Sequence, residues 1–247
     1  MPPRVALFVT CLADILFPHI AEDTVRLLRR LGFQVEFPTR QTCCGQPAYN
    51  SGFRREAAQM ARHFLEVFAD AEAIVTPSGS CAAMVKREYL HLFPAGSPWH
   101  QRAAEVAART FELSQFLVQK MGITDVGATF VGKVTWHDSC HLNRALGIHA
   151  EPRALLRAVH GLELVEMERS DWCCGFGGTF AVRLPEISTA MMGEKIQHAV
   201  DSGAQALVTG DTSCMMHIAG GLRRQGISLP VVHIAQILAG EKVGARR

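Results

Sequence analysis

Short apolar runs alternate along the chain with longer stretches in which apolar residues recur at helical spacing. The runs that predict strands lie at residues 5–9, 34–37, 74–76, 131–137, 163–168 and 206–209. Helical periodicity is clearest at residues 15–31, 54–68 and 81–90. Strands that alternate with helices of this length are typical of βαβ units, so the pattern predicts an α/β fold with mostly parallel sheets flanked by helices.

The chain also repeats itself. Its eight cysteines form two sets of four: Cys11, Cys43, Cys44 and Cys81, then Cys140, Cys173, Cys174 and Cys214. In each set a single cysteine precedes an adjacent pair by about thirty residues, and the fourth follows the pair by about forty. A glycine follows both pairs, and similar segments surround the other cysteines. We therefore predict two similar tandem halves, residues 1–125 and 126–247, related by pseudo-twofold symmetry.

Composition is that of a globular chain, with 48% apolar and 19% charged residues. A net charge of +2, spread through the chain, offers no argument for a nucleic-acid partner. No run approaches the ~18 apolar residues that a membrane helix needs, and the N-terminus lacks a secretion signal. We therefore expect a cytoplasmic protein without a membrane span. In that reducing compartment disulfides are a poor explanation for the cysteines.

Each single cysteine follows a predicted strand, and each adjacent pair lies in the loop after another strand. Because the carboxyl ends of parallel strands meet at one edge of a sheet, the thiols of a half are expected to converge there. Adjacent side chains of an extended strand point to opposite faces, so each pair requires a turn, which Gly45 and Gly175 permit. Such a site favours an iron–sulfur cluster, although zinc and free thiols remain alternatives.

A cysteine, a Cys-Cys-Gly and a further cysteine, occurring twice, resembles the cysteine-rich CCG-domain family over nearly the whole chain. Its members include subunits of heterodisulfide reductase, glycolate oxidase and lactate-utilization systems. Residues 77–81 and 172–178 are most similar to the lactate-utilization members. The resemblance implies that all eight cysteines are ligands of one or two iron–sulfur clusters, of the [4Fe-4S] type. It also implies a redox subunit in the oxidation of L-lactate to pyruvate, acting with a ferredoxin-like iron–sulfur protein and a further subunit.

The chain departs from the fullest family pattern, in which the last cysteine begins a Cys-x-x-Cys. Met84 and His217 stand at the second position of that motif. The difference counts against a thiol–disulfide oxidoreductase similar to heterodisulfide reductase, which is one alternative function. A zinc-stabilised scaffold without enzymatic activity is the other.

Polar residues around the second set of cysteines are candidates for chemistry on a small 2-hydroxy acid. His137 and His141 flank Cys140 and are the candidate catalytic residues, as groups that transfer protons or contact the metal. The alternative is local hydrogen bonding, with Asp138 and Ser139 capping the next helix.

Other polar residues carry weaker signals. His217 lies on the same helical face as Cys214, but a surface histidine is an equal alternative. Arg144 and Arg183 are candidates for carboxylate binding, although surface arginines are more common.

Overall fold

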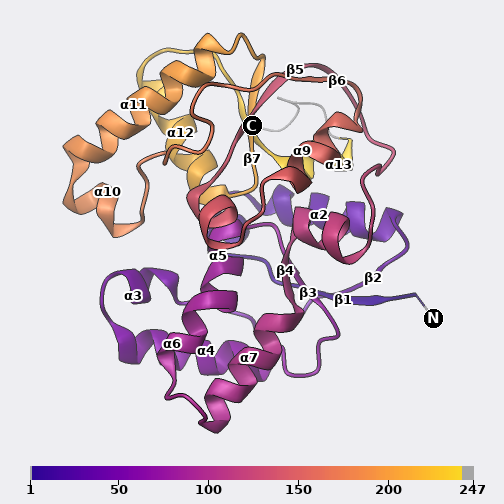
Figure 1. Ribbon diagram of the computed structural model, residues 1–247, viewed down its shortest axis with the longest axis vertical. Helices are drawn as coiled ribbons and strands as arrows, with labels where there is room; N and C mark the ends of the chain where they lie inside the picture. The colour runs from indigo at the N-terminus through magenta and orange to yellow at the C-terminus, as the bar shows by residue number, and fades with distance from the viewer. Residues whose placement is uncertain (1, 241–247) are drawn as a thin grey trace.

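The computed structural model describes residues 2–240, which form two lobes stacked along the long axis of the molecule (Figure 1). Each lobe contains a four-stranded parallel sheet, with strand order β2-β1-β3-β4 in the first and β6-β5-β7-β8 in the second. The strands are β1 (Arg4–Leu7), β2 (Gln34–Glu36), β3 (Ile74–Thr76), β4 (Thr110–Glu112), β5 (Thr129–His137), β6 (His160–Leu164), β7 (Ala206–Thr209) and β8 (Val231–His233). The predicted α/β fold with two similar halves is confirmed.

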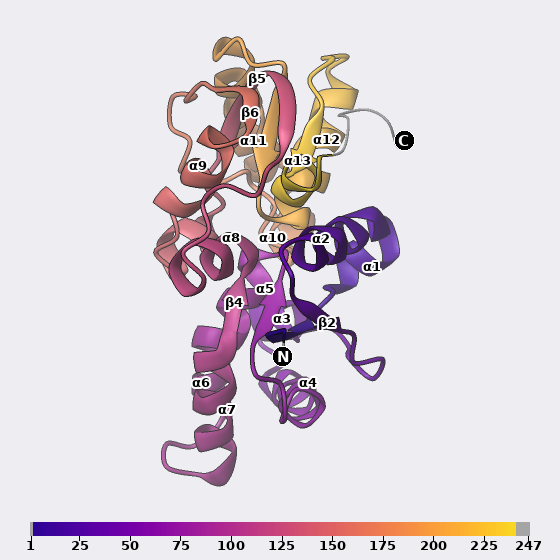
Figure 2. The ribbon, with the colours of Figure 1, turned by 90° about the vertical axis from the view of Figure 1, so that its right-hand side faces the viewer.

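Helices flank both sheets. Those of the first lobe are α1 (Cys11–Leu16), α2 (Pro18–Arg30), α3 (Gln46–Asn50), α4 (Arg54–Val67), α5 (Gly79–Ala83), α6 (Tyr89–Leu92), α7 (Pro98–Arg109) and α8 (Leu113–Gln115). Those of the second are α9 (Ala150–Arg157), α10 (Thr179–Arg183), α11 (Pro185–Asp201), α12 (Thr212–Arg224) and α13 (Ile234–Ala239). Wider π-helical turns follow α5, α8 and Cys140, at Met84–Glu88, Phe116–Lys120 and His141–Ala145. Figure 2 shows α6 and α7 at the end of the first lobe farthest from the second.

The structure differs from the predicted elements in several places. The helix predicted at residues 15–31 is two helices, because Pro18 begins α2 after Phe17, whose backbone is not helical. The strand predicted at residues 163–168 lies earlier, at His160–Leu164. Beyond it the chain still runs beside β5, but the N–H of Met167 donates to the hydroxyl of Thr135 at 3.1 Å instead of to a backbone oxygen. The short strands β4 and β8 were not predicted; each leads within three residues into a helix, which leaves no alternating pattern.

One apolar core joins the two lobes. It contains Leu27 and Phe116 from the first lobe and Trp136, Leu142 and Ile237 from the second, all almost fully buried. The segment between the sheets takes part in this core, so the boundary placed at residues 125 and 126 stays a prediction. Within the described residues, no helix combines the length and the apolar content needed to cross a membrane.

Candidate metal site

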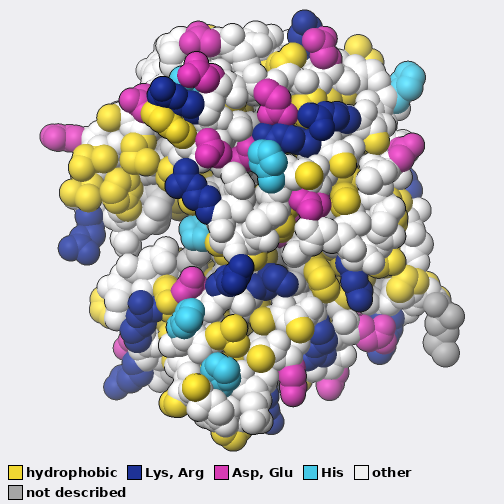
Figure 3. All heavy atoms as spheres, in the orientation of Figure 1, with side chains coloured by type: hydrophobic (Ala, Val, Ile, Leu, Met, Phe, Trp, Pro, Cys, Tyr) yellow, Lys and Arg dark blue, Asp and Glu magenta, His cyan; other side chains and the backbone are white. Residues whose placement is uncertain are grey.

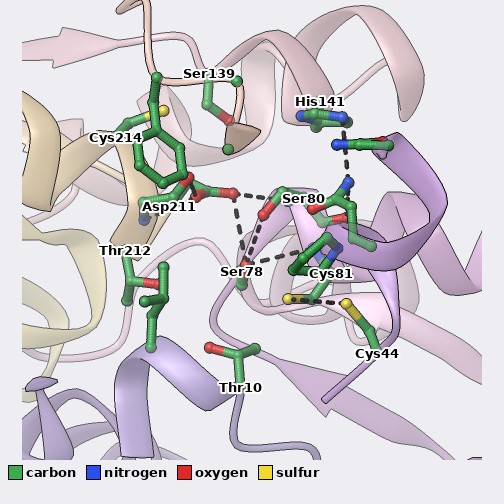
Figure 4. Close-up of a pocket in the computed structure, with 18 of the residues that line it drawn as sticks. Thr10, Cys44, Ser78, Ser80, Cys81, Ser139, His141, Asp211, Thr212 and Cys214 are labelled. Carbon is green, nitrogen blue, oxygen red and sulfur yellow. Dashed lines mark hydrogen bonds between the residues drawn. The ribbon is translucent and has the colours of Figure 1, made fainter. Parts of the chain in front are cut away.

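All eight cysteines line one cavity of about 210 Å³, to which both lobes contribute. Four of the thiols are buried and four are half-buried, two of each kind in either half. Hydroxyl, carboxylate and imidazole groups occupy the wall between the two sets (Figure 4). The labelled members include Ser78, Ser80, Ser139, His141 and Asp211.

The strand order explains why distant cysteines meet. Cys11 begins α1 just after β1, and Cys81 lies in α5 just after β3, the neighbouring parallel strand. Cys140 and Cys214 follow β5 and β7 in the same way. Each adjacent pair comes from the long loop after the strand on the other side of the central one. Three segments of a half therefore deliver its thiols to the same edge of its sheet.

A glycine in the left-handed region ends each Cys-Cys turn. Gly45 has φ +85° and Gly175 has φ +88°, values that side chains with a Cβ rarely adopt. At Gly175 a Cβ would lie 2.5 Å from the carbonyl oxygen of Ser188, so the turn also packs tightly on α11. These glycines let both cysteines of a pair face the cavity.

The thiols of the first half contact one another. The Sγ atoms of Cys11 and Cys43 are 3.7 Å apart, and those of Cys44 and Cys81 are 3.6 Å apart. Hydrogen bonds from Cys11 and Cys44 lower the pKa of Cys43, whereas the hydrogen bond to Cys43 and burial raise the pKa of Cys11 and of Cys44. Among these three thiols, the one that ionises most readily is therefore Cys43.

The second half repeats this arrangement. Hydrogen bonds from Cys140 and Cys174 lower the pKa of Cys173, and those two thiols have raised pKa values. Four crowded thiols cannot all ionise without a cation, because neighbouring thiolates repel one another. Metal binding removes that obstacle by displacing the protons. The clustered cysteines therefore suit a metal ion or an iron–sulfur cluster.

The two candidate histidines occupy different positions. His141 lines the cavity, with Nδ1 3.6 Å from the Sγ of Cys140 and Nε2 3.3 Å from Nε2 of Gln46 in the other half. His137 is fully buried at the end of β5 and is not part of the cavity wall. One ring nitrogen of His137 and the Sγ atoms of Cys174 and Cys214 all lie within 4.8 Å of one another. Burial lowers the pKa of His137 to about 4, so its ring is neutral.

Asp138 does not cap the helix after it. Its carboxylate accepts hydrogen bonds from the indole of Trp136 at 2.8 Å and from Arg153 at 2.7 Å. This buried network holds the end of β5 in place, directly before Ser139 and Cys140.

The weaker candidates lie near the site without converging on it. His217 is half-buried, with Nε2 3.3 Å from the Oγ of Ser188. Arg144 donates to the carbonyl oxygen of Asp171, and Arg183 lines a second, more open pocket together with Gly177. Since Gly177 also belongs to the main cavity wall, Arg183 is close to one side of it.

Sequence reasoning missed two residues that shape the site. Asp211 caps α12, accepting from the backbone N–H of Ser213 at 3.0 Å, and its other oxygen reaches the first half. An acidic residue directly before a predicted helix was a signal that could have identified it. Lys195 is buried, and its Nζ donates to the carbonyl oxygens of Arg169 at 2.6 Å and Ser170 at 3.1 Å, just before the second cysteine pair. A lysine on the apolar face of a helix was the corresponding signal.

Comparisons with known proteins agree with this architecture. A family model described as a cysteine-rich domain, CCG, matches residues 5–86 and again residues 134–219. "Lactate utilization protein A" of Exiguobacterium sp. is 52% identical over 96% of this chain and 97% of its own length. The protein of the same name from Oceanobacillus iheyensis is 46% identical over 98% of both chains.

Among solved structures, a hypothetical protein from Helicobacter pylori matches with a TM-score of 0.66 and 10% identity, over 96% of this chain and 48% of that one. At that identity the match concerns the fold alone. The two domain matches and the full-length relatives go further: the chain belongs to the cysteine-rich CCG-domain family, alongside the proteins named lactate utilization protein A.

Proposed function

We propose that this protein is an iron–sulfur redox subunit of a multi-protein system that oxidises L-lactate to pyruvate. The observation that carries the proposal is the convergence of all eight thiols on one cavity. It stands beside full-length relatives whose name refers to lactate utilization. The electrons go to a ferredoxin-like iron–sulfur partner, in a cytoplasmic complex that includes a further subunit.

The cysteines are the proposed ligands, one set for each half. Cys11, Cys43, Cys44 and Cys81 hold one centre, and Cys140, Cys173, Cys174 and Cys214 hold the other. Four thiolates suffice for a [4Fe-4S] cluster, which when bound takes up and releases one electron at a time. The buried cysteine in each pair and the capped helices α5 and α12 keep the thiols in place and limit the access of water.

The cavity is also the proposed position of a small 2-hydroxy acid. Oxidation of lactate to pyruvate releases two electrons and two protons; the partner receives the electrons and the solvent finally receives the protons. His141 is the proposed acceptor of the hydroxyl proton, because it lines the cavity and the side chain of Gln46 lies beside it. The buried His137, the other candidate, does not reach the cavity wall.

An exposed apolar surface next to the cavity supports a protein partner. Val182 is 81% exposed, Ile187 52% and Leu184 47%, and Figure 3 shows hydrophobic side chains gathered at the position of α10. Leu184 lines the same second pocket as Gly177, which belongs to the cavity wall. Exposed apolar groups of this kind typically mark interaction surfaces. A partner seated there would be close to the second set of thiols.

The zinc-stabilised scaffold is the second candidate, because one observation favours it. The Sγ separations of 3.6 and 3.7 Å in the first half match the spacing of thiolates around one tetrahedral zinc ion. That spacing is about 3.8 Å for zinc–sulfur bonds of about 2.3 Å.

Metal analysis of protein purified without oxygen tests the proposal. We expect a brown protein with iron and acid-labile sulfide in near-equal amounts and an EPR signal after reduction. Cys214→Ser should remove about half of the iron if each half holds a cluster, whereas Ser213→Ala, its neighbour, should keep it. A colourless protein that contains zinc alone would overturn the proposal in favour of the scaffold.

A further inference from the structure

The two halves are not equivalent at the end of their central strands. Residues 9–11 correspond to residues 138–140 in the repeat, so Phe8 of the first half corresponds to His137 of the second. Phe8 packs edge-to-face on Phe64 and Phe68, with ring centroids 4.9 and 5.8 Å apart. The first half therefore has an aromatic cluster where the second has an imidazole.

The helix behind that position differs in the same way. Ala57 and Met60 of α4 contact the Cys-Cys-Gly turn of the first half. Ser188 and Met191 of α11 contact the turn of the second, which aligns the two helices. In that alignment Lys195 takes the place of Phe64. Two buried aromatic residues of the first half are thus replaced by a histidine and a lysine that are also buried.

Lys195 and His137 differ in whether their side-chain nitrogen atoms form hydrogen bonds. Lys195 donates to two backbone carbonyl oxygens. Both ring nitrogens of His137 lack a hydrogen-bond partner among the described residues, although the side chain is 0% exposed. A buried polar group without a partner is costly, so its presence indicates that something absent from the polypeptide satisfies it. The neighbours within 4.8 Å that suit such a group are the thiols of Cys174 and Cys214.

We propose that the imidazole of His137 is a metal ligand, which acts with Cys174 and Cys214 in the second half. In that half His137 takes the place of one of the half-buried thiols, Cys140 or Cys173, in the ligand set. The second half then holds a mixed thiolate–imidazole centre, while the first half, with Phe8 in the equivalent place, holds an all-thiolate one. The inference rests on the proposed function in one respect, that the thiols bind metal. It adds that the two centres differ in kind.

The difference has a chemical consequence. An imidazole is a neutral donor, so a centre that it ligates carries less negative charge than an all-thiolate centre, and histidine ligation raises the reduction potential of iron–sulfur clusters. The buried ammonium group of Lys195 acts in the same direction. The second centre is therefore the stronger electron acceptor of the two.

Isotope labelling tests the ligand without changing the protein. Holoprotein grown on [¹⁵N]histidine and reduced anaerobically should show, by pulsed EPR, a strong nitrogen coupling that changes with the isotope. The coupling should vanish in His137→Phe and in His137→Gln and persist in His141→Ala and His217→Ala, which alter the other histidines of the second site. A redox titration should resolve two steps, and the higher one should shift downward in both His137 variants.

The outcomes separate this inference from the proposed function. Iron and sulfide without a directly bound histidine nitrogen would overturn the inference, including the case in which His137 only donates a hydrogen bond to a thiolate. It would leave the redox subunit intact. If the protein contains zinc alone, the proposed function fails. X-ray absorption at the zinc edge then shows whether a histidine nitrogen binds the metal. A scattering signal from imidazole atoms that disappears in His137→Gln would support His137 as a ligand. A purely sulfur environment around the zinc would refute that role.

Discussion

Asp211 of the second half binds the backbone of Ser80 in the first. One carboxylate oxygen of Asp211 accepts the Ser80 N–H at 2.7 Å, while the other caps its own helix α12 through the N–H of Ser213 at 3.0 Å. Figure 4 shows the two residues facing each other across the cavity wall. A single buried side chain thus stabilises the starts of the helices that carry Cys81 and Cys214, and it sets their relative position.

Removing this carboxylate should destabilise the protein. Asp211→Ala leaves the buried N–H of Ser80 and the half-buried N–H of Ser213 without acceptors. We expect a loss of about 3 kcal/mol in the free energy of unfolding measured with urea. Asp211→Asn retains one acceptor and should lose about half as much. The exposed Asp201, which accepts from Gln197, is the control, and its alanine variant should change stability by about 0.5 kcal/mol or less. Equal effects at both positions would contradict the linking role of Asp211.

The two turn glycines should respond differently to alanine. The left-handed φ alone should cost each variant about 1 kcal/mol or more. Gly175→Ala adds a Cβ 2.5 Å from a backbone oxygen, whereas at Gly45 the nearest atom is the Met60 Cβ at 3.3 Å. We expect Gly175→Ala to be clearly the less stable variant in urea unfolding and to lose metal from the second half. Equal stability of the two variants would show that α11 moves away from the added Cβ of residue 175 at little cost.

Glu112 should make stability depend on pH. Burial raises its pKa from 4.5 to about 7, against the opposing hydrogen bonds from Ser114. The folded state therefore binds the proton more tightly than the unfolded state. The contribution of Glu112 to stability is fully present below about pH 4.5 and falls as the pH rises through about 7.

Glu112→Gln removes that titration. Relative to the parent protein, this variant should gain up to about 3 kcal/mol between about pH 5 and about pH 8 in urea unfolding. A stability difference that is the same at both pH values would show that the carboxyl group is ionised throughout.

The thiols should react in two groups of four in the metal-free, reduced protein. A thiol reagent should first modify the half-buried Cys11, Cys43, Cys140 and Cys173. The buried Cys44, Cys81, Cys174 and Cys214 should react only as fast as the protein opens. Mass spectrometry of the modified peptides identifies each group. Bound metal should protect the cysteines that ligate it, and rapid reaction of any cysteine in the metal-loaded protein would exclude that cysteine as a ligand.

The apolar surface at α10 should matter for the partner and not for the fold. Val182→Glu should slow electron transfer to the ferredoxin-like subunit at least about tenfold, because it places a charge in the proposed interface. Val131, which is 85% exposed on β5, provides a matched control, and Val131→Glu should leave that rate unchanged. Stopped-flow measurements with both variants at equal iron content give the comparison. The same rate in both would place the docking site elsewhere.

Local patterns were enough to predict the fold class and to predict that each set of thiols lies at one edge of its sheet. The apolar runs before Cys11, Cys81, Cys140 and Cys214 marked the central strands, and the duplication marked the two halves. Strand and helix periods are properties of short segments, so they can be read without knowing the packing. The strands β4 and β8 were missed, although β2 and β3 are equally short, because each of the two runs directly into a helix and shows no separate period.

The sequence by itself determined the repeat, the α/β class and the two sets of clustered cysteines. Only the tertiary structure decided that both sets face one cavity and that Asp211 joins the halves. It also decided that His137 is buried with no hydrogen-bond partner among residues 2–240. These facts depend on how one lobe packs on the other and on α11, which supplies Lys195. Packing of this kind arises from contacts between residues far apart in the chain, and no local pattern of polar and apolar positions encodes it.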